Sequence, residues 1–512
     1  MVAIARNARR WLRFCHRWTG LLTAPLFVLW LLSGLVMMYV PFPDLPERQR
    51  MSWLDPIAWD QVRLSPRDAL AAAGWVLPPR DLRLEMERGQ PVYRVVDWSG
   101  RRQRISAVDG TSPGPLGGVE ALEIARRLPG GDHARMMAAL EWDQWTVSGR
   151  YHAYRPLYRL ALDDRAGTEI YLSAATGEVV LSTTLWQRGW NWLGAVPHWI
   201  YLSALRSLPE SWRQAVLWLS GAGIVAAASG LAMGVLRLGP LHRRQDAGGG
   251  GKNRPAREAR ADRFRSARAG FSPYRGWMLW HHWAGLGGGL FLLTWVASGW
   301  LSVNPNGWFD RGGLSRDQQI RYAAMDPAGP VLPSAAALPA GPGGAGAVEA
   351  RFIFVGGREV ILLSDRSGDR TVIDGVSGMP AVWDDAVLFR AAAALYPDAR
   401  LVRGARLTEE DAYWYSHHRH RPLPVLRAEF DDENRTWVHI DPGTGELLGR
   451  LDRSDRQYRW LFHAAHSLDF GPLLRHRPAW DLVVWILSAA GLAVSISGLI
   501  VGWRRLARMG RP

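Results

Sequence analysis

Four long apolar stretches constrain the fold of this 512-residue chain more than any other feature. They cover residues 18–40, 212–236, 277–302 and 480–503, and none has a charged residue in its middle. A helix needs about 20 apolar residues to cross a bilayer, and a charge at its centre would cost a few kcal/mol. The sequence therefore predicts an integral membrane protein with four transmembrane helices.

An internal repeat relates the four stretches, because histidine, tryptophan, serine and glycine recur at matched positions. In the first and third stretches the matches are His16/His281, Trp18/Trp283, Gly20/Gly285, Trp30/Trp295, Ser33/Ser298 and Gly34/Gly299. Around the second and fourth they are Trp192/Trp460, His198/His466, Ser220/Ser488, Gly223/Gly491, Ser229/Ser497 and Gly230/Gly498. Both copies have the same orientation, so we expect two tandem halves related by a pseudo-twofold axis along the membrane normal.

Arginine clusters predict which side of the membrane each connection occupies. The net charge of +15 is concentrated in residues 1–17, 237–276 and 504–512. Cytoplasmic segments next to membrane spans carry an excess of Lys and Arg. We therefore place these three segments in the cytoplasm of a bacterium, and residues 41–211 and 303–479 in the periplasm beyond its inner membrane. This distribution favours topology and contact with lipid headgroups, rather than nucleic-acid binding, as the role of the charge.

The two outer segments have an α+β pattern that is repeated. A Ser65 N-cap followed by Pro66 predicts the start of the first short helix. The other predicted elements are strands near 91–96, 103–108, 158–162 and 169–172 with a helix near 119–128, then strands near 360–363, 370–373 and 435–440 with a helix near 384–395. We expect two helix–strand–strand units in the first segment and a repeat of this pattern in the second.

Several motifs together resemble one known family. Turns of the form D-x-x-[ST]-G follow strand pairs at Asp374–Gly378 and Asp441–Gly445, as in PepSY units. The His-x-Trp-x-Gly-Leu spans and the segments around Pro197–Tyr201, Tyr415–Leu426 and Phe462–Leu468 resemble the PepSY-associated transmembrane helix family. The resemblance covers essentially the whole chain. It implies two pseudo-symmetric halves, each with a periplasmic PepSY-like α+β domain. The family includes iron-regulated inner-membrane reductases that bind two b-type haems and help to release iron from ferric siderophores.

Four repeated histidines are the candidate cofactor ligands. Under a twofold axis, His16 and His281 would meet near the cytoplasmic face, and His198 and His466 near the outer face. Each pair could supply two axial imidazoles to one haem iron. The chain lacks a C-x-x-C-H motif and has Cys15 as its one cysteine, so both haems would be non-covalent haem b.

Other interpretations of these histidines stay open. His282 is an alternative to His281, and His463 is an alternative to His466. Histidine and tryptophan at a membrane boundary also serve as interfacial anchors, and glycines also mediate helix packing. The sequence alone does not choose between these roles.

A second group of basic residues lies in the outer segments. It comprises His417, His418 and Arg421, with His152 and Arg155 as its counterpart in the first copy. The group could bind an anionic substrate or a haem propionate, or it could form a solvated basic surface. No residue is predicted to be catalytic in its own right.

These patterns favour a haem-dependent oxidoreductase. We expect a di-haem b reductase that passes electrons across the membrane to a periplasmic ferric siderophore during iron uptake. The predicted cytoplasmic loop is too short and too rich in Arg and Gly to form a flavin or nicotinamide domain, so a membrane quinol or a separate cytoplasmic donor would supply the electrons. The alternative is a non-enzymatic PepSY membrane protein that binds or regulates a periplasmic protein.

Overall fold

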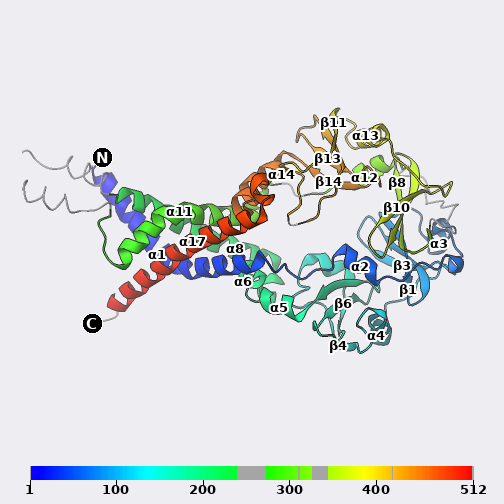
Figure 1. The fold of residues 1–512 in the computed structure, drawn as a ribbon, viewed down its shortest axis with the longest axis horizontal. Helices are drawn as coiled ribbons and strands as arrows, with labels where there is room; N and C mark the ends of the chain where they lie inside the picture. Colours follow the sequence, from blue (N-terminus) through cyan, green and yellow to red (C-terminus); the bar gives the residue numbers. More distant parts are fainter. Residues whose placement is uncertain (1, 239–271, 310–311, 326–343, 418, 510–512) are drawn as a thin grey trace, which may run out of the picture. The chain divides into compact units, whose positions relative to one another are not determined.

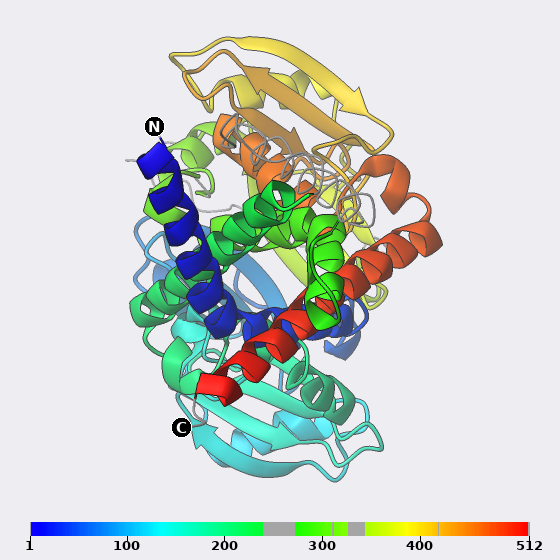
Figure 2. The same ribbon diagram turned by 90° about the vertical axis from the view of Figure 1, so that its left-hand side faces the viewer.

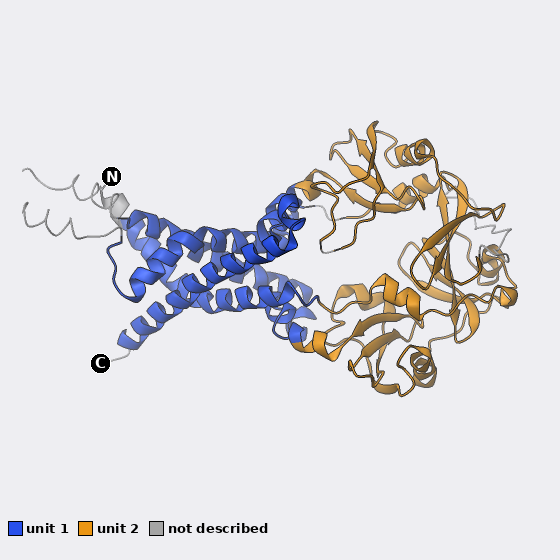
Figure 3. Ribbon diagram, viewed as in Figure 1, with its two compact units in different colours: residues 1–41, 190–309, 457–512 blue, residues 42–189, 310–456 orange. Residues whose placement is uncertain are grey.

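The computed structural model describes residues 2–238, 272–309, 312–325, 344–417 and 419–509. The fold is α+β, with four membrane-length apolar helices and three sheets in this part of the chain. Two compact units are present (Figure 3): unit 1 comprises Met1–Pro41, Trp190–Phe309 and Gln457–Pro512, and unit 2 comprises Phe42–Gly189 and Asp310–Arg456. Most of the basic loop predicted at 237–276 lies outside the described residues.

Unit 1 is a bundle built on the four apolar helices. These are α1 (Val2–Met37), α8 (Pro209–Leu236), α11 (Trp277–Ser302) and α17 (Arg477–Met509), and each is long and apolar enough to cross a membrane. The chain is therefore a membrane protein by the length and composition of its helices, as the sequence predicted. Helix α1 begins well before the predicted span because its arginine-rich start favours helix formation.

The bundle follows the internal repeat. Helices α1 and α11 each pack against both α8 and α17 (Figures 1 and 2). Small residues permit the close approach: a side chain on Gly223 would collide with Val296 and Phe27, and one on Gly288 would meet the backbone of Ala490. Phe27, Leu31, Leu292 and Val296 fill the centre.

Short helices complete unit 1 beside the four long ones. They are α5 (Leu185–Asn191), which ends in this unit, α6 (Ala195–His198), α7 (Ser203–Arg206), the 3-10 turn η3 (Pro305–Gly307), the π-helix η5 (Arg459–Ala464), α15 (Ala465–Ser467) and α16 (Gly471–Leu474). Helix α6 packs against α1, and α15 packs against α11. These two short helices bring His198 and His466 to the bundle.

Unit 2 contains three antiparallel sheets. The first four-stranded sheet has the order β4 (Arg135–Leu140), β5 (Leu157–Ala161), β6 (Glu169–Ser173), β7 (Val179–Thr183). The second has the order β11 (Leu401–Leu407), β12 (Val425–Phe430), β13 (Trp437–Ile440), β14 (Leu447–Leu451). Helix α4 (Gly118–Arg127) packs on the first and α13 (Asp385–Ala393) on the second.

The third sheet joins the two halves of the repeat. Its order is β10 (Arg370–Asp374), β9 (Arg358–Asp365), β8 (Ala347–Val355), β1 (Asp81–Glu87), β2 (Gln90–Val96), β3 (Arg102–Ser106). At its centre β1 pairs with β8, with Leu84 opposite Ala350. The remaining helices of unit 2 are α2 (Glu47–Trp53), η1 (Trp59–Gln61), α3 (Pro66–Ala72), η2 (Gly149–Tyr154), α12 (Arg316–Ala323) and α14 (Arg453–Tyr458).

The two faces of the six-stranded sheet differ sharply in chemistry. Successive residues of a strand point to opposite faces. On one face Leu82 and Leu84 join a buried apolar cluster that includes Leu70 of α3. On the other face Arg83 and Glu85 lie among further charged side chains. The sheet thus has an apolar core on one side and a buried ionic cluster on the other.

The predicted helices of unit 2 are confirmed, whereas the strand prediction was incomplete. Helix α3 begins after Ser65, whose hydroxyl accepts a hydrogen bond from the Asp68 amide, and Asp384 caps α13 in the same way. Strands β1, β4, β7, β8, β11, β12 and β14 were not predicted. Each predicted helix–strand–strand element therefore has three or four strands instead of two, and the six-stranded sheet contains strands from both halves of the repeat. The charged alternation of β1, D-L-R-L-E-M-E, lowered its apparent strand propensity.

The turn at Asp374 gives a pH-dependent prediction. Its carboxylate accepts hydrogen bonds from the Ser377 amide, the Arg358 guanidinium and the Val376 amide, and these lower the pKa of Asp374 from 3.8 to about 2. Because the pKa of Asp374 is lower in the folded protein than in the unfolded chain, the ionised carboxylate stabilises the folded state at pH values above about 4. This stabilisation is lost as the pH falls from about 4 to 2. The melting temperature of Asp374→Asn should lie below that of the wild type at pH 7, and the difference should shrink near pH 2.5. A difference that is constant with pH would contradict this assignment.

Candidate functional site in the helix bundle

The first pair of predicted ligands is brought together in unit 1. His16 of α1 and His281 of α11 are half-buried, and their ring centroids lie 6.1 Å apart. The rings are inclined to each other by 29°. The two histidines therefore face each other across the bundle from equivalent positions of the repeat.

Hydrogen bonds fix the orientations of the His16 and His281 rings, which we call the inner pair after the predicted topology; His198 and His466 are the outer pair. Nδ1 of His16 donates to the carbonyl of Ala226, at 3.0 Å. Nδ1 of His281 lies 3.1 Å from the Ser497 hydroxyl, which donates its own proton to the carbonyl of Ala493 and so accepts from the imidazole. With the proton on Nδ1, the lone pair is on Nε2, the nitrogen that a metal would bind.

The second pair shows the same arrangement. His198 of α6 and His466 of α15 are half-buried, with ring centroids 6.1 Å apart and planes at 71°. Nδ1 of His198 lies 3.0 Å from the Trp30 carbonyl, and Nδ1 of His466 lies 3.2 Å from the Trp295 carbonyl. The matched tryptophans of the repeat thus contribute backbone acceptors, which the sequence analysis did not anticipate.

The matched serines support the same tautomer in the outer pair. Ser33 and Ser298 each lie 3.1 Å from a histidine Nδ1, and each donates its hydroxyl proton to its own helix backbone. The serine oxygens are therefore acceptors for the imidazole N–H. Nδ1 is tied to protein in all four rings, and a metal would bind on the Nε2 side.

Four glycines make room for the four rings. A Cβ built on Gly230 would lie 2.5 Å from Cε1 of His16, and one on Gly498 would lie 3.2 Å from Cε1 of His281. The corresponding distances are 3.3 Å from Gly34 to His198 and 3.4 Å from Gly299 to His466. The sequence analysis matched these glycines between the copies without giving them a role. Their function is to let an imidazole lie directly against a neighbouring helix.

The spacing of each pair fits two axial ligands of one metal. With metal–nitrogen bonds of roughly 2.0 Å, the centroids of two opposed imidazoles lie about 6 Å apart. Both observed separations, 6.1 Å, agree with this value. Metal-ligating histidines also typically donate Nδ1–H to a carbonyl or hydroxyl oxygen, as all four of these rings do. The residues present therefore fit bis-imidazole ligation at both positions.

A cavity surrounds the inner pair. Its volume is about 1090 Å³, comparable with that of small-molecule and cofactor sites. Gly20, Gly285, Phe27 and Leu292 give it an apolar, glycine-lined wall. Its basic lining residues are Arg10, Arg13, Arg17, Arg237 and Arg505. A flat apolar group that carries carboxylates matches this combination of walls and charges.

The two alternative histidines differ from the proposed ligands in their contacts, although His282 lines the same cavity as His16 and His281. His282 is buried, its Nδ1 lies 2.8 Å from the Ser272 hydroxyl, and its Nε2 donates to the Gly234 carbonyl at 2.9 Å. Both nitrogens of His282 are thus engaged by protein. His463 packs edge-on against Tyr458 and Phe462. The geometry favours His281 and His466 as the ligands.

The basic residues predicted in the outer segments precede two different strands. His152 and Arg155 precede β5, whereas His417 and Arg421 precede β12 in a different sheet, and His418 lies outside the described residues. Arg155 donates to the Thr146 carbonyl, and Arg421 stacks on Trp414 at 4.6 Å. The strands that follow begin at Leu157 and Val425, so the repeat is offset by two residues from the match of Arg155 with Arg421.

In the described part of the chain, no group of three or more His, Cys, Asp or Glu side chains is placed to hold a metal ion. The paired histidines of the bundle are thus the candidate site. Neither a scan against protein-family models nor a search of curated proteins found a match to this chain.

Proposed function

We propose that the chain is a di-haem b membrane reductase that passes electrons to a ferric siderophore. The proposal rests on two pairs of imidazoles, His16 with His281 and His198 with His466. In each pair the ring centroids are 6.1 Å apart and Nδ1 is hydrogen-bonded to protein. The resemblance to PepSY-associated membrane proteins supports the substrate class and the inner-membrane location. When bound, two b-type haems would carry single electrons between the ends of the bundle.

The protein's own residues would bind, orient and shield the cofactors. His16 and His281 would hold the inner group, and His198 and His466 the outer one. The Ala226 and Trp30 carbonyls keep the proton on Nδ1 and leave Nε2 for ligation. The inner arginines would neutralise propionates, because a buried carboxylate needs a cationic partner.

The two pairs lie at different heights in the bundle. On α1, His16 belongs to the inner pair, and Ser33 contacts the outer pair. At 1.5 Å rise per residue these positions are roughly 25 Å apart along the helix. The arrangement therefore matches a two-step path across a bilayer about 30 Å thick. A membrane quinol or a separate cytoplasmic protein would act as donor.

The purified protein, expressed with ample haem, tests the proposal. We expect a low-spin b-type spectrum, haem that is extracted by acid, and reoxidation of the reduced protein by a ferric siderophore with release of Fe²⁺ to a ferrous chelator. A protein without Soret absorption would contradict the proposal and favour the non-enzymatic alternative. Bound haem without ferric reduction would retain the electron-transfer site and reject the substrate class.

The alternative ligands give a more limited prediction. His282→Ala and His463→Ala should retain both haems, because both ring nitrogens of His282 are hydrogen-bonded to protein and His463 packs against Tyr458 and Phe462. The measurement is the haem-to-protein ratio together with the reduced spectrum. Loss of about half of the haem in either variant would reassign the ligand at that site.

A further inference from the structure

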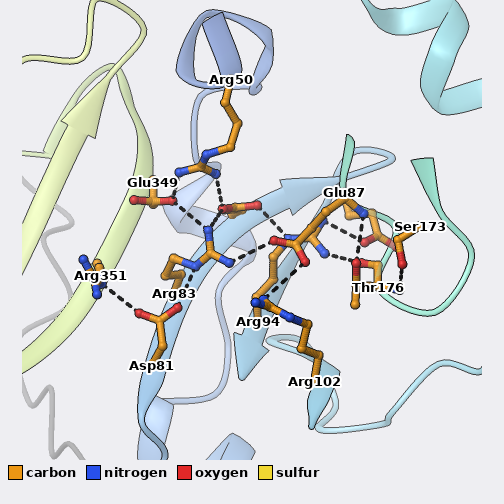
Figure 4. Close-up of polar contacts among 12 residues, drawn as sticks. Arg50, Asp81, Arg83, Glu87, Arg94, Arg102, Ser173, Thr176, Glu349 and Arg351 are labelled. Carbon is orange, nitrogen blue, oxygen red and sulfur yellow. Dashed lines mark hydrogen bonds and ion pairs between the residues drawn. The ribbon is translucent and has the colours of Figure 1, made fainter. Parts of the chain in front are cut away.

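The charged face of the six-stranded sheet contains a connected network of ion pairs (Figure 4). Its members come from β1, β2, β3, β8, β10, α2 and the turns before β7 and β14. They are Arg50, Asp81, Arg83, Glu85, Glu87, Arg94, Arg102, Arg104, Glu178, Glu349, Arg351, Arg370 and Glu446, and Glu47 joins them through Arg50. Glu85 lies opposite Glu349 across the β1–β8 pairing, so cations are required to separate these carboxylates.

Most arginines of the network form close ion pairs with its carboxylates. Arg50 contacts both Glu85 and Glu349 and so partly offsets the repulsion between them, although burial and the neighbouring Glu85 still raise the pKa of Glu349. Arg83 contacts Glu178 at 2.9 Å, and its repeat counterpart Arg351 contacts Glu446 at 2.6 Å. The matched T-G-E motifs of the two copies therefore supply carboxylates that tie one sheet to another.

The repeat is broken at one arginine. Arg370 of the second copy contacts Glu446 at 2.7 Å, but its counterpart Arg102 is 3.9 Å from Glu178, which Arg83 already engages. Within the described residues, the buried Nε of Arg102 has no hydrogen-bond partner. Its guanidinium lies 4.2 Å from the ring centroid of Tyr154, which orients it.

Arg102 lines a cavity of about 380 Å³ on this face of the sheet. Arg80 also lines the cavity, and within the described part of the chain it makes no ion pair. The carboxylates of the lining are Glu47, Asp81, Glu349 and Glu446, and each is engaged by Arg50, Arg83, Arg351 or Arg370. The guanidinium groups of Arg80 and Arg102 thus lack a close anionic partner among the described residues, whereas the carboxylates beside them are already paired.

We propose that this cavity binds a small multivalent oxyanion, a carboxylate or phosphate group, through Arg80 and Arg102. Guanidinium groups bind both classes of oxyanion with paired charge-assisted hydrogen bonds. The volume suits a small ligand, near the lower limit of ordinary binding pockets. The oxyanion would give Arg102 a closer partner than Glu178, which lies at 3.9 Å. The inference is independent of haem binding, because every residue that it uses belongs to unit 2.

Titration calorimetry on the full-length protein in detergent tests the site, with citrate and inorganic phosphate as separate probes. Saturable binding of one or both is expected, and the better probe identifies the source of the oxyanion. Arg102→Gln should weaken binding by about 10- to 100-fold, as expected for loss of charged hydrogen bonds. Arg80→Gln should act in the same direction, and because Arg80 is exposed this variant leaves the network intact.

Arg101→Gln is the matched control. Arg101 adjoins Arg102 and carries the same charge, but its side chain is 72% exposed, pairs with Asp97 and does not line the cavity. The Arg101→Gln protein should bind the probe with the same affinity as the wild type. The proposal is overturned if the wild type binds neither probe, or if Arg101→Gln weakens binding as much as Arg80→Gln and Arg102→Gln do. Haem spectra recorded on the same samples measure haem binding separately, so failure of the oxyanion site can be distinguished from failure of the proposed reductase function.

Discussion

Replacing His16 or His281 with alanine should remove, or convert to another spin state, about half of the bound haem. Each residue provides one of two opposed imidazoles, whose ring centroids are 6.1 Å apart. In the proposed function, loss of either would remove one of the two imidazoles that would hold the inner haem, and the other pair would be unchanged. His198→Ala and His466→Ala should affect the remaining half. The haem-to-protein ratio and the reduced absorption spectrum measure both effects.

Electron transfer gives the second measurement on the same variants. Any one of the four substitutions should stop reduction of an external ferric chelate, since both sites lie on one path. Gly230→Val provides an independent test, because its side chain would occupy the space of the His16 ring, 2.5 Å from Cε1 at the first added carbon. It should reproduce the inner-site spectrum of His16→Ala. Four alanine variants with unaltered haem content would refute histidine ligation.

Arg83→Met should strongly destabilise unit 2. Arg83 is 13% exposed and contacts four carboxylates, those of Asp81, Glu85, Glu178 and Glu349. These groups lower the free energy of its charged form, so the pKa of Arg83 is raised well above its ordinary value despite burial. Removal of one member from a buried ion network leaves charges uncompensated and costs about 3–5 kcal/mol. Thermal unfolding followed by tryptophan fluorescence would show the loss.

Arg135→Met is the matched control for this change. Arg135 pairs with Asp163 at 2.8 Å, but its side chain is 58% exposed. An exposed ion pair contributes at most about 1 kcal/mol, so the unfolding temperature should change little. Equal effects of the two substitutions would show that the network contributes no more than a surface pair.

The bundle could be predicted from sequence because its signals are local and repeated. Apolar length alone located all four helices, and the constant spacing from His16 to Gly34 and from His281 to Gly299 identified equivalent positions. Opposition of equivalent residues then follows from symmetry. The choice of His281 over His282 needed coordinates, because adjacent helical residues differ in direction and only the partners of each ring nitrogen distinguish them.

The acceptors and glycines around the rings could not be predicted in the same way. Trp30 acts through its backbone carbonyl, which its side chain does not reveal. Gly230 contacts His16 from another helix, and that contact depends on helix packing. In unit 2, β1 was missed because Asp81, Glu85 and Glu87 have low strand propensity, although the alternation of charged and apolar residues is that of a strand. Here the charged face is buried, since each carboxylate has an arginine partner.

The pairing of β1 with β8 has a consequence for biosynthesis and for the history of the chain. Strand β1 is made long before β8, and α8 and α11 lie between them in the sequence. Until β8 emerges, one edge of β1 has no neighbour, and unpaired edges promote aggregation. A separately expressed first half would keep that open edge permanently. Each copy keeps one four-stranded sheet of its own, but the six-stranded sheet is complete only when the strands of both copies are present.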